Sequence, residues 1–245
     1  KVNFISDLND TLLVEADECF PNPVYGIYNF SSLEFDSDST FSVVTWNVEN
    51  FPKKYNSTLD AMEAVITQMK ADVICLQEII DEAYFNELIS RLDDYDGYLS
   101  NLAAYDLNLA VLFSSEVELI SIFEINIGVD DWWAFPRPPQ VIQLNWQNIE
   151  LFIINNHFKA NDSGTEDEDR RRAASEELEN YVNDYLPGEN VIIVGDLNDE
   201  LTETASENVF WNFISKPAEF QFADMKIAQD ISEYQWSYPA WPSHL

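Results

Sequence analysis

Four short, mostly apolar runs in this sequence each end just before a polar side chain. Runs of this length, bounded by polar residues, are typical of buried β-strands. They are residues 41–46 before Asn47, 73–77 before Glu78, 151–154 before Asn156-His157, and 191–195 before Asp196. We therefore expect four strands to deliver polar groups to one rim of the fold.

Helical patterns separate these runs. Residues 57–60 (Ser-Thr-Leu-Asp) have the composition of a helix cap. The apolar side chains that follow recur on one helical face at Leu59, Met62, Val65, Ile66 and Met69. A second stripe follows Glu78, at Phe85, Leu88, Ile89 and Leu92, and a strand is expected at 109–113.

The second half of the chain continues the alternation. Residues 141–144 and 149–153 flank a short polar turn, which predicts an antiparallel hairpin. Thr165 with Glu168 resembles a capping box at the start of a long helix, which Pro187-Gly188 would end. Strands that alternate with helices predict the α/β class.

Length and composition favour one domain. The 245 residues, 46% of them hydrophobic, can bury a large core. We interpret residues 1–38 as an N-terminal extension packed on a domain that covers residues 39–245. Cys75 lies inside an apolar run and is expected to be a buried thiol. Because Cys19 is the only other cysteine, no disulfide framework is expected.

No apolar run approaches the length of about 18 residues that a membrane span requires. The sequence begins at Lys1, without a methionine or a charged and then apolar leader. This start fits a secreted or periplasmic protein whose leader has been removed.

The chain is strongly acidic. Forty-five acidic residues against 12 basic ones give a formal net charge of -33, which repels nucleic acids and anionic membranes at long range. Several basic residues nevertheless lie in or near the loops that follow the four runs: Lys53, Lys54, Arg137, Lys159, Arg170, Arg171 and Arg172. They either form a local positive pocket that favours compact phosphate substrates, or are solvated loop charges.

The four motifs read Trp46-Asn47, Leu76-Gln77-Glu78, Asn156-His157-Phe158 and Gly195-Asp196-Leu197-Asn198. In their order, spacing and strand contexts they resemble the endonuclease/exonuclease/phosphatase superfamily over residues 41 to 245. The resemblance implies a DNase I-like fold, a four-layer αββα sandwich of two mixed β-sheets with the site at one edge. It also implies hydrolysis of phosphoesters with a divalent metal.

Individual roles follow from chemistry and from this resemblance. Glu78 is the candidate metal ligand, because a carboxylate at a strand end suits Mg²⁺, with Mn²⁺ or Ca²⁺ as alternatives. Asn47 is similar to the family residue that orients the metal or the phosphate. Asp196 and Asn198 resemble the family pair that orients and activates the attacking water, in which the carboxylate accepts its proton or a hydrogen bond and the carboxamide steadies a phosphate oxygen. A simple Asx turn is the alternative. His157 resembles the family histidine that contacts phosphate or transfers a proton.

Arg137 lies between prolines and resembles a phosphate-contacting arginine of the DNase branch. The aromatic residues Trp132, Trp133 and Phe135 precede it. They are expected either to stack on a base or lipid or to form a local core.

The resemblance is incomplete at the C-terminal end. Family members continue with an Asp-containing strand and a Ser-Asp-His motif, and this sequence has neither. Residues 241–245 look like the approach to that strand, and His244 is not expected to be the missing histidine. We therefore expect the C-terminal strands to be absent and the activity of this chain to be impaired. An incomplete sheet would also leave an unpaired edge through which the chain could associate with another.

The leading hypothesis is a secreted, metal-dependent phosphodiester hydrolase of the nuclease type, with DNA or RNA as candidate substrates. One alternative is a phosphatase or a phospholipase of the sphingomyelinase type. The other is a noncatalytic binding module on the same fold.

Overall fold

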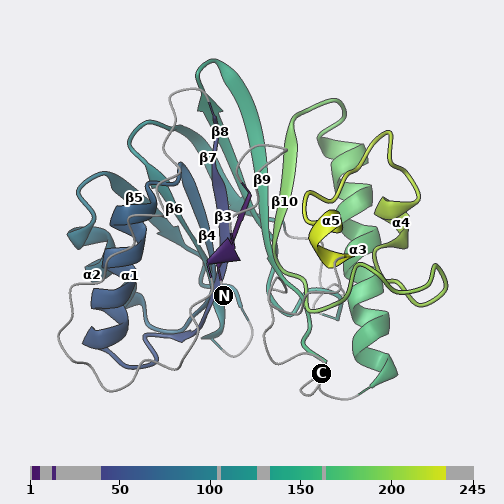
Figure 1. The fold of residues 1–245 in the computed structure, drawn as a ribbon, viewed down its shortest axis with the longest axis horizontal. Helices are drawn as coiled ribbons and strands as arrows, with labels where there is room; N and C mark the ends of the chain where they lie inside the picture. Colours follow the sequence, from purple (N-terminus) through teal and green to yellow (C-terminus); the bar gives the residue numbers. More distant parts are fainter. Residues whose placement is uncertain are drawn as a thin grey trace.

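The computed structural model describes residues 2–5, 13–14, 40–103, 106–125, 133–161 and 164–229 (Figure 1). The strands are β1 (Val2–Ile5), β2 (Leu13–Val14), β3 (Val43–Phe51), β4 (Val73–Ile79), β5 (Tyr95–Leu99), β6 (Asn108–Ser114), β7 (Glu118–Glu124), β8 (Gln140–Trp146), β9 (Ile149–His157) and β10 (Val191–Asp196). The helices are α1 (Asn56–Met69), α2 (Glu82–Arg91), α3 (Thr165–Tyr185), α4 (Trp211–Ile214) and α5 (Met225–Ala228).

These strands form two mixed sheets. The first has the order β2-β1-β3-β4-β6-β5 and the second has the order β10-β9-β8-β7. Among the described strands, only the pairs β3/β4 and β9/β10 are parallel, and the predicted hairpin is formed by β8 and β9. The strands β1 and β2 extend the first sheet beyond β3. The division of the chain at residues 38 and 39 stays a prediction.

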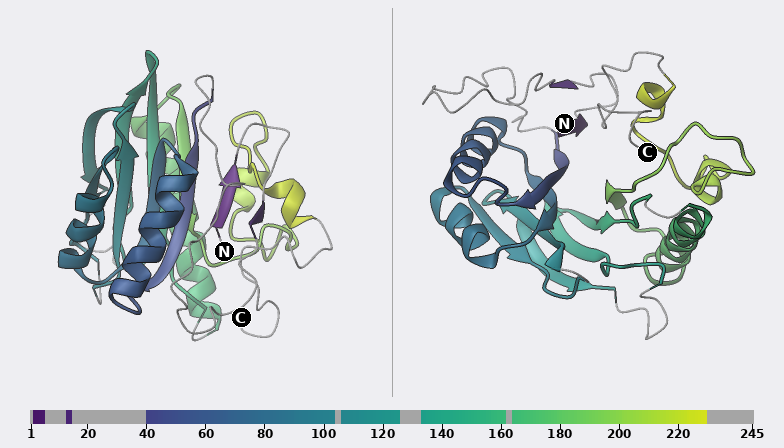
Figure 2. Two further views of the ribbon diagram at one scale, coloured as in Figure 1. Left: turned by 60° about the vertical axis from the view of Figure 1, so that its left-hand side comes forward. Right: turned by 90° about the horizontal axis from the view of Figure 1, so that it is seen from below.

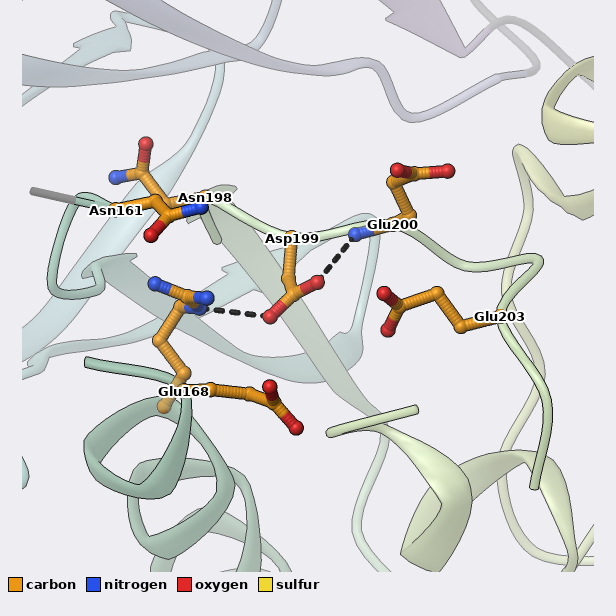
Figure 3. Close-up of a pocket in the computed structure, with 7 residues that line it drawn as sticks. Asn161, Glu168, Asn198, Asp199, Glu200 and Glu203 are labelled. Carbon is orange, nitrogen blue, oxygen red and sulfur yellow. Dashed lines mark hydrogen bonds and ion pairs between the residues drawn. The ribbon is translucent and has the colours of Figure 1, made fainter. Parts of the chain in front are cut away.

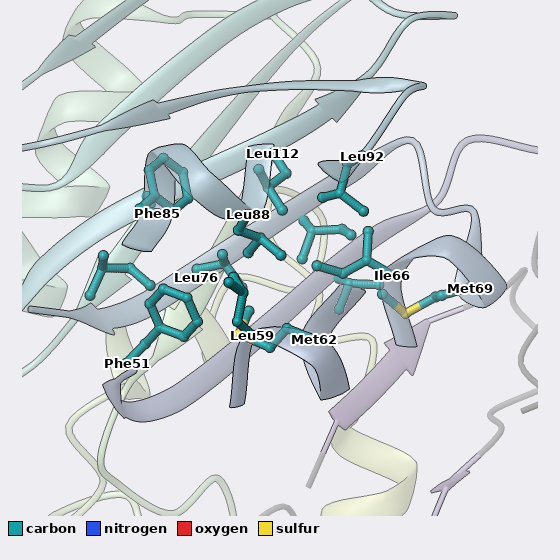
Figure 4. Close-up of a cluster of buried hydrophobic side chains, with 14 of the residues drawn as sticks. Phe51, Leu59, Met62, Ile66, Met69, Leu76, Phe85, Leu88, Leu92 and Leu112 are labelled. Carbon is teal, nitrogen blue, oxygen red and sulfur yellow. The ribbon is translucent and has the colours of Figure 1, made fainter. Parts of the chain in front are cut away.

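Helices and sheets form four layers, which Figure 2 shows from two sides, and three apolar clusters lie between these layers. Between the sheets, Val73, Cys75 and Val111 pack against Ile142 and Ile153. Outside the first sheet, α1 and α2 bury the predicted stripes against β4 and β6 (Figure 4). Outside the second sheet, α3 and α4 pack on β8 and β9. The prediction of an αββα sandwich is therefore confirmed.

Both predicted helix starts differ from the structure. The helix α1 begins at Asn56, because Tyr55 takes a positive φ and turns the chain into the helix before Ser57. The helix α3 begins at Thr165 itself, with Gly164 as its N-cap and no side-chain cap. Thr165 is thus inside the helix, so the capping box is wrong. The acidic residues of the first turn still complement the helix dipole.

Gly195 is essential to the end of β10. Its φ is +143°, a region that side chains rarely adopt, and a Cβ there would lie 2.1 Å from the carbonyl oxygen of Asn156. A glycine therefore lets β10 approach β9 closely at this point. The next residue is Asp196, which pairs with His157 in the parallel register.

Cys75 is a buried, free thiol as expected, and burial raises the pKa of that thiol far above its ordinary value. Cys19, Trp132 and His244 lie outside the described residues, as does the whole segment 230–245, whose last five residues were interpreted as the approach to the missing strand. Among the residues that the structure does describe, no helix has both the length and the apolar character of a membrane span.

Candidate active site

The four predicted strand ends meet at one edge of the sandwich. Asn47 of β3 connects them, since its Nδ2 donates to Glu78 Oε1 at 2.9 Å and to Asp196 Oδ2 at 2.8 Å. His157 lies opposite, with its Nε2 at 3.9 Å from Glu78 Oε1 and 4.0 Å from Asp196 Oδ2. One carboxamide thus holds two carboxylates from different sheets beside one imidazole.

Glu78 is held in a strained and well-oriented conformation. Its φ is +67°, which is unusual for a residue with a side chain and is characteristic of functional positions. Its second oxygen, Oε2, accepts a hydrogen bond from the backbone N–H of Asn50 at 3.0 Å. Both carboxylate oxygens therefore have neutral donors, and these donors orient the group without cancelling its charge.

His157 is nearly inaccessible, with 4% of its surface exposed. Burial lowers the pKa of its imidazole to about 3, the charge of Arg137 adds to the fall, and Glu78 opposes it. The imidazole is thus neutral near pH 7, and its approaches to the two carboxylates are not ion pairs. A neutral imidazole can exchange a proton or donate one hydrogen bond at Nε2.

The segment from Asp196 to Asn198 forms a tight turn. The backbone N–H of Asn198 donates to Asp196 Oδ1 at 3.2 Å, which is the Asx turn considered from the sequence. The Asn198 carboxamide donates to the carbonyl of Phe158 at 3.1 Å and so links this turn to the loop after His157. A direct contact between Asn198 and phosphate stays a prediction.

Arg137 lies beside the site but is buried. Only 9% of its surface is exposed, and its Nη1 is 3.4 Å from the carbonyl oxygen of Phe158. It acts on His157 through its positive charge. Contact with phosphate stays a prediction. Of the neighbouring aromatic residues, Phe135 belongs to the core under α3, whereas Trp133 is 45% exposed.

A buried carboxamide network under the site was not predicted. Gln77 Nε2 donates to Asn155 Oδ1 at 2.8 Å, and the Asn155 amide donates to the carbonyl of Ala110 at 3.0 Å. Both side chains are at most 1% exposed. The network connects the strand of Glu78 to the strand of His157 across the two sheets. Asn155 and Asn156, which directly follow the apolar run 151–154 within the same strand, were the signal for it in the sequence.

The basic residues near the site do not form a strongly positive pocket. Arg171 pairs with Asp199 at 2.7 Å, Arg172 with Glu168 at 2.8 Å, Lys159 with Asp167 at 3.4 Å, and Lys53 with Glu49. Of the two alternatives, these four side chains do not support the positive pocket, because a carboxylate offsets each charge.

An acidic cavity adjoins the site instead (Figure 3). Its volume is about 100 Å³, and it is lined by Asn161, Glu168, Arg171, Asn198, Asp199, Glu200 and Glu203. Burial and the neighbouring carboxylates, Asp199 first among them, raise the pKa of Glu203 to about 7. The cavity thus presents negative charge next to Asn198.

This raised pKa predicts a pH-dependent effect on stability. Between the ordinary glutamate pKa of 4.5 and about 7, Glu203 binds more protons in the folded than in the unfolded chain. Its contribution to stability is therefore complete below pH 4.5 and is lost as pH rises through 7. We expect Glu203→Gln to raise the Tm at pH 8 but not at pH 4.5. Equal shifts at both pH values would contradict this.

The donor set fits a hard cation such as Mg²⁺. Within the described part of the chain, no three His, Cys, Asp or Glu side chains are grouped so as to hold a metal by themselves. Mg²⁺ usually takes only one or two carboxylates and keeps several waters. Glu78 is 17% and Asp196 30% exposed, so both carboxylates reach solvent from a fixed position.

Residues 44–215, which contain all four motifs, match the model of the Endonuclease/Exonuclease/phosphatase family. The chain belongs to this family. Its homologues hydrolyse phosphodiesters or phosphate monoesters and generally depend on divalent metals. No curated protein sequence matches the chain.

Solved structures of this family share the fold. The D. rerio TDP2 structure with a single strand DNA product has a TM-score of 0.55 at 18% identity, over 68% of this chain and 63% of that one. The human Nocturnin catalytic domain with bound sulfate has a TM-score of 0.58 at 20% identity, over 80% and 76%. The Bacteroides thetaiotaomicron mannosyl-6-phosphatase Bt3783 has a TM-score of 0.55 at 15% identity, over 72% and 71%. The chain thus spans less than two thirds of the TDP2 structure.

Proposed function

We propose that this family member hydrolyses phosphodiesters with a divalent cation, of which Mg²⁺ is the first candidate. The observation that supports it most is the placement of His157 within 4.0 Å of two carboxylates that Asn47 holds together. Four strand ends from two sheets converge there. Secretion stays a prediction.

Each residue would have a distinct task. Glu78 would hold the cation, with Asn47 orienting it, and the bound cation would supply a Lewis acid that offsets the charge of the phosphate. Asp196 would accept the proton of the attacking water. The imidazole of His157 is neutral before the reaction and would donate a hydrogen bond from Nε2 to a phosphate oxygen. The buried location of His157 would exclude competing water from that contact.

A phosphomonoester substrate is the second candidate. The acidic cavity beside Asn198 favours it, because Glu168, Glu200 and Glu203 would repel the further phosphates of a nucleic acid. The same fold carries the mannosyl-6-phosphatase activity of Bt3783. A DNA substrate has its own support, since D. rerio TDP2 has been seen with a single strand DNA product.

A substrate panel tests both candidates. The full-length gene product would be assayed on bis(4-nitrophenyl) phosphate, 4-nitrophenyl phosphate and a single-stranded oligonucleotide, with Mg²⁺, Mn²⁺ or Ca²⁺ and with EDTA. Diester hydrolysis that EDTA abolishes and His157→Gln removes is the expected result. Hydrolysis of the monoester alone would favour the second candidate. Cation binding without any hydrolysis would favour a noncatalytic binding module.

A further inference from the structure

Arg171 of α3 connects the two loops that carry the site. Its Nε donates to Asp199 Oδ2 at 2.7 Å, and its Nη1 donates to the carbonyl of Lys159 at 3.1 Å. Asp199 directly follows Asn198, and Lys159 is two residues after His157. We infer that Arg171 is a positioning residue that keeps Asp196 and His157 in register. The inference rests on the proposed function of that site.

The ion pair between Arg171 and Asp199 is buried, which requires its two side chains to be placed accurately. The side chains of Arg171 and Asp199 are 5% and 8% exposed. A buried ion pair is weak support for stability, because the cost of removing both charges from water offsets their attraction. It does fix geometry, since the planar guanidinium has donors in a rigid arrangement. The pair is therefore better explained by loop placement than by stability alone.

A second link between the same loops lies nearer the site. The N–H of Phe158 donates a hydrogen bond to the carbonyl of Asp196 at 2.9 Å, and the Asn198 carboxamide donates one to the carbonyl of Phe158. The site loops are thus joined directly and also through the helix. Figure 3 shows Asn198 and Asp199 on one stretch of chain, with Asp199 bonded to the guanidinium from α3.

The next residue on the helix provides a matched control. Arg172 pairs with Glu168 and donates to the carbonyls of Glu207 and Asn208. These acceptors belong to α3 itself and to a later loop. Loss of Arg172 therefore removes the same charge from the same helix turn without releasing the loops of His157 and Asp196.

The first experiment measures how Arg171→Met changes kcat and how it changes KM. In the full-length protein with Mg²⁺ and bis(4-nitrophenyl) phosphate, Arg171→Met is expected to lower kcat roughly 10–100-fold, as the loss of supporting contacts around a site does. KM should change much less, because displacing Asp196 from the attacking water affects the reaction more than substrate binding. Arg172→Met should keep kcat near that of the unchanged protein. An unchanged kcat in Arg171→Met would overturn the inference.

A double variant separates positioning from stability. Arg171→Met alone leaves the Asp199 carboxylate buried without its partner, so this variant is expected to lower the Tm. Arg171→Met with Asp199→Leu removes both charges and is expected to restore the Tm but not kcat. Recovery of both Tm and kcat would show that the pair acts only through stability, which would overturn the inference.

A spectroscopic readout needs no turnover. The sequence contains two histidines, His157 and His244, so a His244→Gln background assigns the imidazole NMR signals. Arg171→Met should shift the His157 signals, whereas Arg172→Met should leave them in place. Unshifted signals in Arg171→Met would overturn the inference even if the unchanged protein hydrolyses nothing. Shifted signals in a protein without hydrolysis would support positioning and count against the proposed function only.

Discussion

Glu78→Gln is expected to lower Mg²⁺-dependent hydrolysis of bis(4-nitrophenyl) phosphate by roughly 10²–10³-fold, the usual effect of losing one group that stabilises developing charge. Glutamine keeps the size of the side chain, but its single carbonyl oxygen can accept only one of the two hydrogen bonds that Asn47 and Asn50 donate to the two oxygens of Glu78. It lacks the negative charge that would hold the cation. Steady-state rates at saturating Mg²⁺ would measure the loss.

The matched control is Glu176→Gln, because Glu176 is exposed on α3 and the substitution removes the same charge. It should leave the rate unchanged. Binding of Mn²⁺, followed by calorimetry, should weaken in Glu78→Gln and not in Glu176→Gln. If both variants bind Mn²⁺ equally well, Glu78 is not the ligand, whatever happens to the rate.

Gly195→Ala is expected to destabilise the fold by about 3 kcal/mol or more, in the upper range of overpacking effects. The new Cβ would lie 2.1 Å from the carbonyl oxygen of Asn156, and a backbone atom cannot rotate away as a side chain does. For a chain of this size the Tm should fall by roughly 6–12 °C. Because Asp196 is the next residue, hydrolysis should fall as well.

Gly188→Ala is the control for the backbone part of this effect. Gly188 also has a positive φ, of +83°, but no atom lies within 4 Å of the added Cβ. The substitution Gly188→Ala should lower the free energy of unfolding only by the cost of a left-handed conformation, about 1 kcal/mol. Thermal unfolding of both variants would give the difference. Equal losses of Tm would mean that β10 moves aside and that the close approach to β9 is not required.

Local patterns predicted most of the strands and helices, whereas the arrangement of these elements in four layers was predicted from the family resemblance. Apolar runs predicted β3, β4, β6, β8, β9 and β10 but not β5 or β7. Stripes of spacing three and four predicted the buried faces of α1 and α2. The helix starts could not be predicted in the same way. They depend on single backbone angles at Tyr55 and Gly164, which the pattern of side-chain types does not determine.

The site shows the same division between local and long-range information. The positions of Asn47, Glu78, His157 and Asp196 at strand ends followed from the motifs. The partners of the basic side chains did not, because the Arg171–Asp199 pair joins residues 28 positions apart. Nor could the sequence alone show that Gln77 and Asn155 meet across the sheets, at a separation of 78 residues.

The hydrogen bond from Asn47 to Asp196 joins residues that are 149 positions apart. During synthesis, Asn47 and Glu78 would leave the ribosome long before the strand that brings Asp196 is made. Because closing so long a loop costs entropy before the contact offsets it, we expect this hydrogen bond to form late in folding. A nascent chain would therefore carry half of the site without any hydrolytic capacity, and the appearance of activity would mark the docking of the second sheet on the first.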